Sequence, residues 1–142
     1  MPMLDEALRK DVADVLAMMV EPVTVHFHPK PGEAASDAMD ALLHDVASLS
    51  DKVLLQAETG PAPLVAPDVP EEMTSSVVVL SADGRPTGVR YLGFPGGREF
   101  GTFLQDVVNI SAKVAPRVSP DTVRYIQNLE RPLHLQVFVT PT

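Results

Sequence analysis

Apolar residues recur along the first half of the chain with two alternating periods. Residues 3–19 and 33–49 carry them at helical spacing, with polar residues between. The stretches Val23–His28 and Val53–Ala57 are short and rich in β-branched or aliphatic residues, as strands are. The pattern predicts helix, strand, helix and strand in that order.

The second half begins with a connection at residues 60–76 that holds four prolines, Pro61, Pro63, Pro67 and Pro70. This composition predicts irregular chain, with at most a short helical turn at 70–72. An aliphatic run at 77–80 then predicts a buried strand, and Asp83-Gly84 predicts a hairpin turn into a further strand at 88–92.

Two further helices and a last strand complete the predicted order. Residues 99–110 have one strongly apolar face, and Ser119 with Pro120 is a favourable start for a helix that ends near residue 128. Residues 133–139 alternate between apolar and polar and predict a strand. Helices between strands imply parallel crossovers and the hairpin adds an antiparallel pair, so the class is α/β with a mixed sheet.

Composition excludes several classes of function. The length of 142 residues suits one ordinary domain, and a net charge of −8 disfavours binding to nucleic acid or to an anionic membrane. The chain has no cysteine, which excludes disulfides and thiolate chemistry within it. Charged residues interrupt the N-terminal segment and no apolar run is long enough to span a membrane, so the expected location is the cytoplasm.

Three stretches resemble one protein family: MLDEALRKDVADVLAMMVEPVTVHF at 3–27, GVRYLGFPGGREFGTFLQDVVNIS at 88–111 and NLERPLHLQVFVTPT at 128–142. They resemble the N-terminal half of tandem thioredoxin-fold proteins, which include glutaredoxin-like protein disulfide oxidoreductases and the flavoprotein subunit of alkyl hydroperoxide reductase. The resemblance covers nearly the whole chain. It implies a thioredoxin-like fold with a four-stranded mixed sheet flanked by helices, an extra N-terminal helix and a C-terminal strand.

Two redox features that the resemblance implies are missing. The turn that carries Cys-x-x-Cys in the family corresponds to residues 29–36, which include Pro31, Gly32, Glu33 and Ser36 but no sulfur. The cis-proline that faces those cysteines corresponds to residues 73–76, whose last three are Thr74, Ser75 and Ser76. The resemblance therefore predicts no catalytic residue here.

The end of the chain corresponds to the first strand of the family's second thioredoxin-like unit. We therefore expect a redox-inactive domain at 1–131 and, at 132–142, the start of a second unit in a shortened form of a longer redox protein. An apolar strand without its sheet tends to pair with another sheet edge. This predicts a homodimer through residues 133–139.

Other candidate sites have structural explanations that we favour. His26 and His28 share one face of a strand, as metal ligands do, with His44 or Asp37 as a conceivable third ligand, but partly buried histidines are the commoner case. The sequence thus predicts no metal site and no cofactor.

The glycine turn at Gly93, Pro95, Gly96 and Gly97 has the position of a phosphate loop, yet it lacks the Lys-Ser/Thr ending and is expected to be structural. The carboxylates Glu33, Asp37, Asp40 and Asp45 fit a solvated helix face, and Ser36 fits a helix cap.

Three functions remain open. The first is a non-catalytic thioredoxin-fold module of a protein that performs thiol–disulfide exchange or peroxide defence, with a second thioredoxin-like unit as its partner and a peroxiredoxin as a further candidate. The second is a stand-alone interaction domain that binds through the groove between residues 29–36 and 73–76. The third is an enzyme of different chemistry that uses His26, His28 or Ser36.

Overall fold

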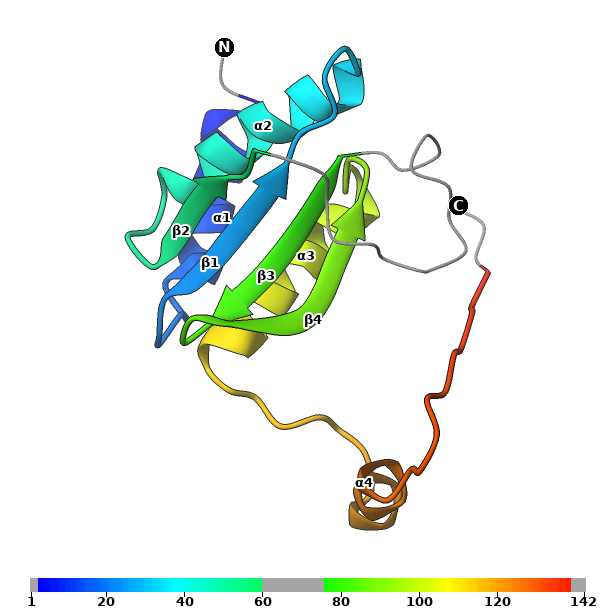
Figure 1. The fold of residues 1–142 in the computed structure, drawn as a ribbon. Helices are drawn as coiled ribbons and strands as arrows, with labels where there is room; N and C mark the ends of the chain where they lie inside the picture. The colour runs from blue at the N-terminus through cyan, green and yellow to red at the C-terminus, as the bar shows by residue number, and fades with distance from the viewer. Residues whose placement is uncertain (1–2, 60–75, 139–142) are drawn as a thin grey trace.

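A computed structural model describes residues 3–59 and 76–138 (Figure 1). The proline-rich connection, including the helical turn predicted at 70–72, lies outside these residues except for Ser76. The elements are α1 (Glu6–Leu16), β1 (Val23–His28), α2 (Ala34–Ala47), β2 (Val53–Ala57), β3 (Val77–Ala82), β4 (Arg85–Leu92), α3 (Arg98–Ser111) and α4 (Pro120–Gln127).

The strands form one mixed sheet in the order β2-β1-β3-β4. β1 and β2 are parallel and joined by α2, whereas β3 pairs antiparallel with both β1 and β4. Asp83 and Gly84 make the β3–β4 turn with φ angles of 53° and 71°, as the Asp-Gly dipeptide predicts. The predicted α/β class and four-stranded mixed sheet are confirmed.

The helices α1, α2 and α3 lie on one side of the sheet (Figure 1). Val23, Val25 and Phe27 of β1 face this side and are at most 1% exposed. Helix α3 supplies its apolar face, including Phe103 and Val107, to the same core. The alternate residues of β1, which are Thr24, His26 and His28, are only half-buried, so the opposite side of the sheet is more polar.

Several element boundaries differ from the predicted ones. α1 is shorter than residues 3–19 because Asp5 caps it, its side chain accepting a hydrogen bond from the N–H of Leu8 at 2.8 Å. β4 begins at Arg85 rather than at residue 88, because pairing with β3 continues to the hairpin turn. Ser119 caps α4 as predicted, accepting a hydrogen bond from the N–H of Thr122, and Pro120 is its first residue.

The strand predicted at residues 133–139 is wrong for the residues that the structure describes. Residues 133–138 belong to no sheet, and their apolar side chains are exposed, from 64% at Leu133 to 90% at Phe138. An alternating sequence becomes a strand only where a sheet edge accepts its backbone hydrogen bonds. In Figure 1 the segment runs from α4 back toward the level of the four-stranded sheet, but it joins no strand.

In its described parts, the chain contains no helix of the length and apolar character that a membrane crossing requires.

Candidate functional site

The turn at residues 29–36 is closed by its own hydrogen bonds. Ser36 is 2% exposed, and its Oγ accepts a hydrogen bond from the backbone N–H of Lys30 at 2.9 Å. Gly32, between Pro31 and Glu33, has a φ of 81°, which glycine adopts without strain. Ser36 is not the helix cap that the sequence suggested, since Glu33 occupies that position and α2 has already begun at Ala34. It holds together the turn before the helix.

Ser76 directly precedes β3 and is the last residue of the stretch that corresponds to the cis-proline region of the family. It is 1% exposed, and its carbonyl oxygen accepts a hydrogen bond from the N–H of Gly93 at 2.8 Å. Its buried Oγ has no hydrogen-bond partner within the described structure. Thr74 and Ser75 lie outside the described residues. Residues 3–59 and 76–138 contain no cis peptide bond.

The glycine turn has a geometry that favours a structural role. Gly93 and Gly97 have φ angles of 78° and 60°, and Gly97 caps α3. A Cβ at Gly96 would lie 2.7 Å from the ring of Phe94, so a side chain there would displace that ring. Pro95 is buried. These constraints explain the glycines and the proline without a bound phosphate.

The half-buried side of the sheet carries a polar cluster formed by His26, Glu58 and Ser81. Nδ1 of His26 lies 2.6 Å from Oε1 of Glu58, and Nε2 lies 2.8 Å from Oγ of Ser81. The cluster borders a cavity of about 420 Å³, whose wall also includes Thr24, His28, Gln56, Val79, Gly84 and Pro86. The strand register brings these residues together: His26 is opposite Gln56 on β2 and Val79 on β3, and Thr24 is opposite Ser81.

The prediction that His26 and His28 share a face is confirmed, since both line this cavity. Nδ1 of His28 is buried without a hydrogen-bond partner in the part of the chain described. Neither proposed third ligand joins them: Asp37 does not line the cavity, and Nδ1 of His44 contacts Asp40. Among residues 3–59 and 76–138, no three His, Cys, Asp or Glu side chains are grouped as a metal site requires.

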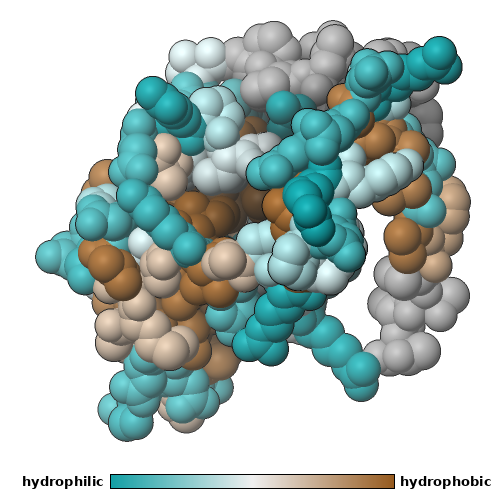
Figure 2. Space-filling model, turned by 90° about the horizontal axis from the view of Figure 1, so that it is seen from below, coloured by the Kyte–Doolittle hydropathy of each residue, from teal (hydrophilic) through white to brown (hydrophobic). Residues whose placement is uncertain are grey.

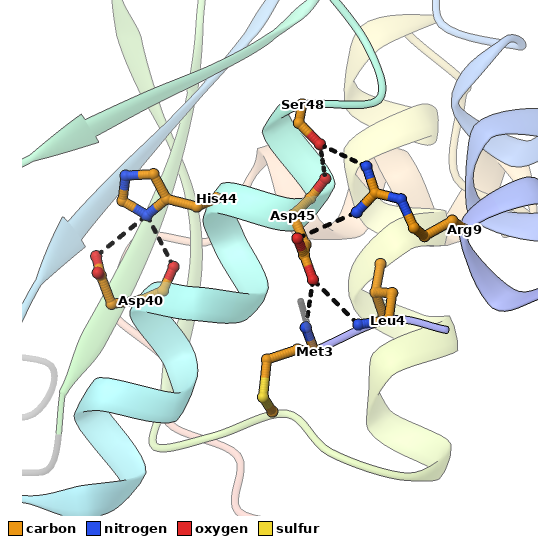
Figure 3. A network of polar contacts seen from close by, with 7 residues as sticks. All are labelled: Met3, Leu4, Arg9, Asp40, His44, Asp45 and Ser48. Atoms are coloured by element: carbon orange, nitrogen blue, oxygen red, sulfur yellow. Dashed lines mark hydrogen bonds and ion pairs between the residues drawn. The ribbon is translucent and has the colours of Figure 1, made fainter. Parts of the chain in front are cut away.

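One member of the predicted acidic helix face has a different role. Asp45 of α2 accepts hydrogen bonds from the backbone N–H groups of Met3 and Leu4 at 2.5 and 3.0 Å, and from Nη1 of Arg9 at 3.1 Å (Figure 3). Burial acts to raise the pKa of Asp45, but the hydrogen bonds and the guanidinium outweigh it and lower the pKa. Asp45 therefore attaches the N-terminal segment to α2.

The sequence did not reveal Glu58 and Ser81 as partners of His26. It also did not reveal that the Asp45 carboxylate binds the N-terminal segment. The hairpin at Asp83-Gly84 could have indicated the side of the sheet that Ser81 faces, because the turn fixes the register of β3. No local pattern placed Glu58 beside His26, since 32 residues separate them.

Many of the exposed large hydrophobic residues lie in α4 and the segment after it. α4 has no buried residue, and Tyr125 and Ile126 are 69% and 56% exposed. A second cavity of about 700 Å³ lies between α4 and the segment after it, bordered by Arg124, Tyr125, Asn128, Leu129, Glu130, Arg131, Pro132 and Leu133. Figure 2 views the molecule from this side and shows hydrophobic residues on the surface among polar ones.

Comparison with known proteins identifies the fold. The structure is similar to that of the alkyl hydroperoxide reductase protein AhpF of Enterococcus faecalis, with a TM-score of 0.68 and 22% identity over 89% of this chain and 61% of the other. It is equally similar to a protein disulfide oxidoreductase from Aeropyrum pernix, with a TM-score of 0.67 and 19% identity over 90% of this chain and 57% of the other. The chain has the thioredoxin-like fold.

Sequence comparison agrees with the structural one. The chain is 25% identical over 141 residues to the AhpF protein of Staphylococcus epidermidis, which covers 99% of this chain and 25% of that protein. A match of 30% identity to AhpF of another strain of that species covers 63 residues, which are 44% of this chain and 12% of that protein. The matched part of the chain thus corresponds to a quarter or less of the length of these relatives. No family model matches it. The resemblance predicted from the sequence is confirmed.

Proposed function

We propose that this chain is a thioredoxin-fold module of a thiol–disulfide exchange system and is itself non-catalytic in that exchange. It serves as the scaffold or docking half for a second thioredoxin-like unit. The observation that carries the proposal is the turn at residues 29–36, which joins β1 to α2. It has no cysteine, and a hydrogen bond from Lys30 to Ser36 closes it. Similarity to AhpF and to a protein disulfide oxidoreductase supports this redox context. A cytoplasmic location is part of the same proposal.

The exposed apolar surface supports the docking part of the proposal. Residues of α4 and the turn after it leave large hydrophobic side chains in water, among them Tyr125, Ile126 and Leu129. Surfaces of this kind mark interaction sites in soluble proteins. A second thioredoxin-like unit, beginning at about residue 132, is the partner that we assign to this surface, and a peroxiredoxin is a further candidate.

The chain is expected to be inactive in thiol–disulfide exchange. With dithiothreitol as reductant, insulin should precipitate in its presence no faster than in buffer, because no side chain of the chain provides a thiolate. The assay follows turbidity and uses a thioredoxin with both cysteines as positive control. An acceleration that depends on the concentration of this chain would disprove the non-catalytic assignment.

A homodimer through residues 133–139 is a further part of the proposal. Both outer strands, β2 and β4, have one edge without a partner strand among the described residues. Such edges accept an added strand. We expect the chain to sediment as a dimer, and the double substitution of Leu135 and Val137 by aspartate to yield a monomer.

The matched control for this experiment is Gln136→Asp, which introduces a charge between the same two residues at a position that is already polar. It should leave the dimer intact if apolar contacts hold the strand. Sedimentation velocity measures all three proteins. A monomeric unsubstituted chain would remove the homodimer but leave the scaffold role in place.

The second candidate function is a stand-alone interaction domain that binds through the groove between residues 29–36 and 73–76. The observation that favours it is the buried Oγ of Ser76, which has no hydrogen-bond partner among the described residues. Capture of a peroxiredoxin by the chain, lost in Ser76→Val but kept in Ile126→Asp, distinguishes this candidate from docking through α4.

A further inference from the structure

The contacts of His26 define which of its ring nitrogens carries the proton. An ionised glutamate only accepts hydrogen bonds, so Oε1 of Glu58 at 2.6 Å places the proton of a neutral His26 on Nδ1. Nε2 is then an acceptor, and the hydroxyl of Ser81 at 2.8 Å donates to it. In this arrangement a carboxylate orients an imidazole, and the imidazole accepts a hydrogen bond from a serine hydroxyl.

This order of groups is the one that activates a serine for attack on a carbonyl. A serine hydroxyl is a weak nucleophile by itself, and a base within hydrogen-bond distance removes its proton as it attacks. Both distances in the cluster lie within the range that such transfer needs, which is about 2.6–3.2 Å. His44 and Asp40 form a similar pair on α2, 3.4 Å apart, but no serine of the described residues is hydrogen-bonded to that histidine.

The surroundings of the cluster provide room for a ligand. The cavity of about 420 Å³ falls within the size range of small-molecule sites, and Ser81 itself forms part of its wall. Thr24, directly opposite Ser81 in the sheet, lines the same cavity with a hydroxyl, and Gln56 adds an amide. A hydroxyl and an amide can each donate a hydrogen bond to a carbonyl oxygen that gains negative charge.

We propose that Ser81, His26 and Glu58 form an acyl-transfer site that accepts small activated esters. Oγ of Ser81 bonds to the carbonyl carbon while its proton passes to Nε2 of His26. The bond from that carbon to the leaving alcohol then breaks, and the alcohol takes the proton from Nε2. Water repeats the sequence on the acyl-serine and releases the acid. Glu58 is a positioning residue, since it acts through His26.

Covalent labelling of the full 142-residue chain with a fluorophosphonate tests the proposal directly. We expect one label per chain, assigned to Ser81 by peptide mass spectrometry, with loss of fluoride as hydrogen fluoride. Ser81→Ala should remove the label. His26→Gln should slow labelling by about 100-fold or more, because the base is gone.

Two controls separate activation from effects on folding. His44→Gln removes the histidine of the other His–carboxylate pair and should label at the unsubstituted rate. Glu58→Gln should slow labelling while the temperature of thermal unfolding stays close to that of the parent. If the cluster were purely structural, Glu58→Gln would lower the unfolding temperature, and Ser81 would not be labelled in the parent either. Absence of label on Ser81, a label on another serine, or an unchanged rate in His26→Gln would each overturn the proposal.

Discussion

Replacing Phe103 with alanine should lower the free energy of unfolding by about 3–5 kcal/mol, the range typical of a buried phenylalanine truncated in a core. Phe103 is 1% exposed and belongs to the face of α3 that covers the sheet. Its ring packs edge-on against that of Tyr91 on β4, with centroids 5.4 Å apart. The substitution therefore removes apolar burial and an aromatic contact together. Urea unfolding followed by circular dichroism measures the change.

The matched control is Tyr125→Ala, which truncates an aromatic residue on the exposed helix α4. Because Tyr125 is 69% exposed, the change should be within about 0.5 kcal/mol of the parent. A loss at Tyr125 comparable to that at Phe103 would show that α4 packs against the domain in solution, in contradiction to the structure.

Tyr91 connects this part of the core to a polar contact at its edge. Its hydroxyl donates a hydrogen bond to the carboxylate of Asp106, one turn beyond Phe103 on α3. Burial raises the pKa of Tyr91, and the hydrogen bond to Asp106 raises it further. The phenol therefore remains protonated and keeps donating throughout the physiological range of pH.

The fold could be predicted from the sequence because its signals are local. The periods of apolar residues located each helix and each strand of the sheet, and Asp83-Gly84 specified the hairpin. The family resemblance then supplied the arrangement of the strands. The strand predicted at residues 133–139 is absent from the described part, 133–138. Its pattern is local, but a strand requires a partner, and no residue near it in the sequence provides one.

The polar sites were less predictable because they depend on contacts between distant segments. His26 meets Glu58 and Ser81 across two neighbouring strands, 32 and 55 residues away. Asp45 was interpreted as part of a solvated helix face, because its spacing from Asp37 and Asp40 fits one. Only the path of the N-terminal segment reveals that Met3, Leu4 and Arg9 surround it.

Asp45→Ala should lower the free energy of unfolding at neutral pH by about 1.5–3 kcal/mol, the range for hydrogen bonds to a charged group. The side chain of Asp45 is only 15% exposed and accepts from two backbone N–H groups as well as from Arg9 (Figure 3). Removal of the carboxylate leaves the two backbone N–H groups without this acceptor, while Arg9 keeps its hydrogen bond to Ser48. The matched control is Asp40→Ala on the same helix, whose side chain is 50% exposed and pairs with His44. That control should stay within about 0.5 kcal/mol of the parent.

The effect of Asp45→Ala should also depend on pH in a defined direction. Folding lowers the pKa of Asp45 below its ordinary value of 3.8, so the folded state binds this proton less readily than the unfolded state does. The stabilisation is therefore complete above the ordinary pKa and is lost as the pH falls through the pKa of the folded state. Urea unfolding of the parent and the variant should differ most at neutral pH, and the difference should shrink in acid below about pH 4. A difference that stays constant down to about pH 2 would mean that the charge of Asp45 contributes nothing and that the variant acts through packing alone.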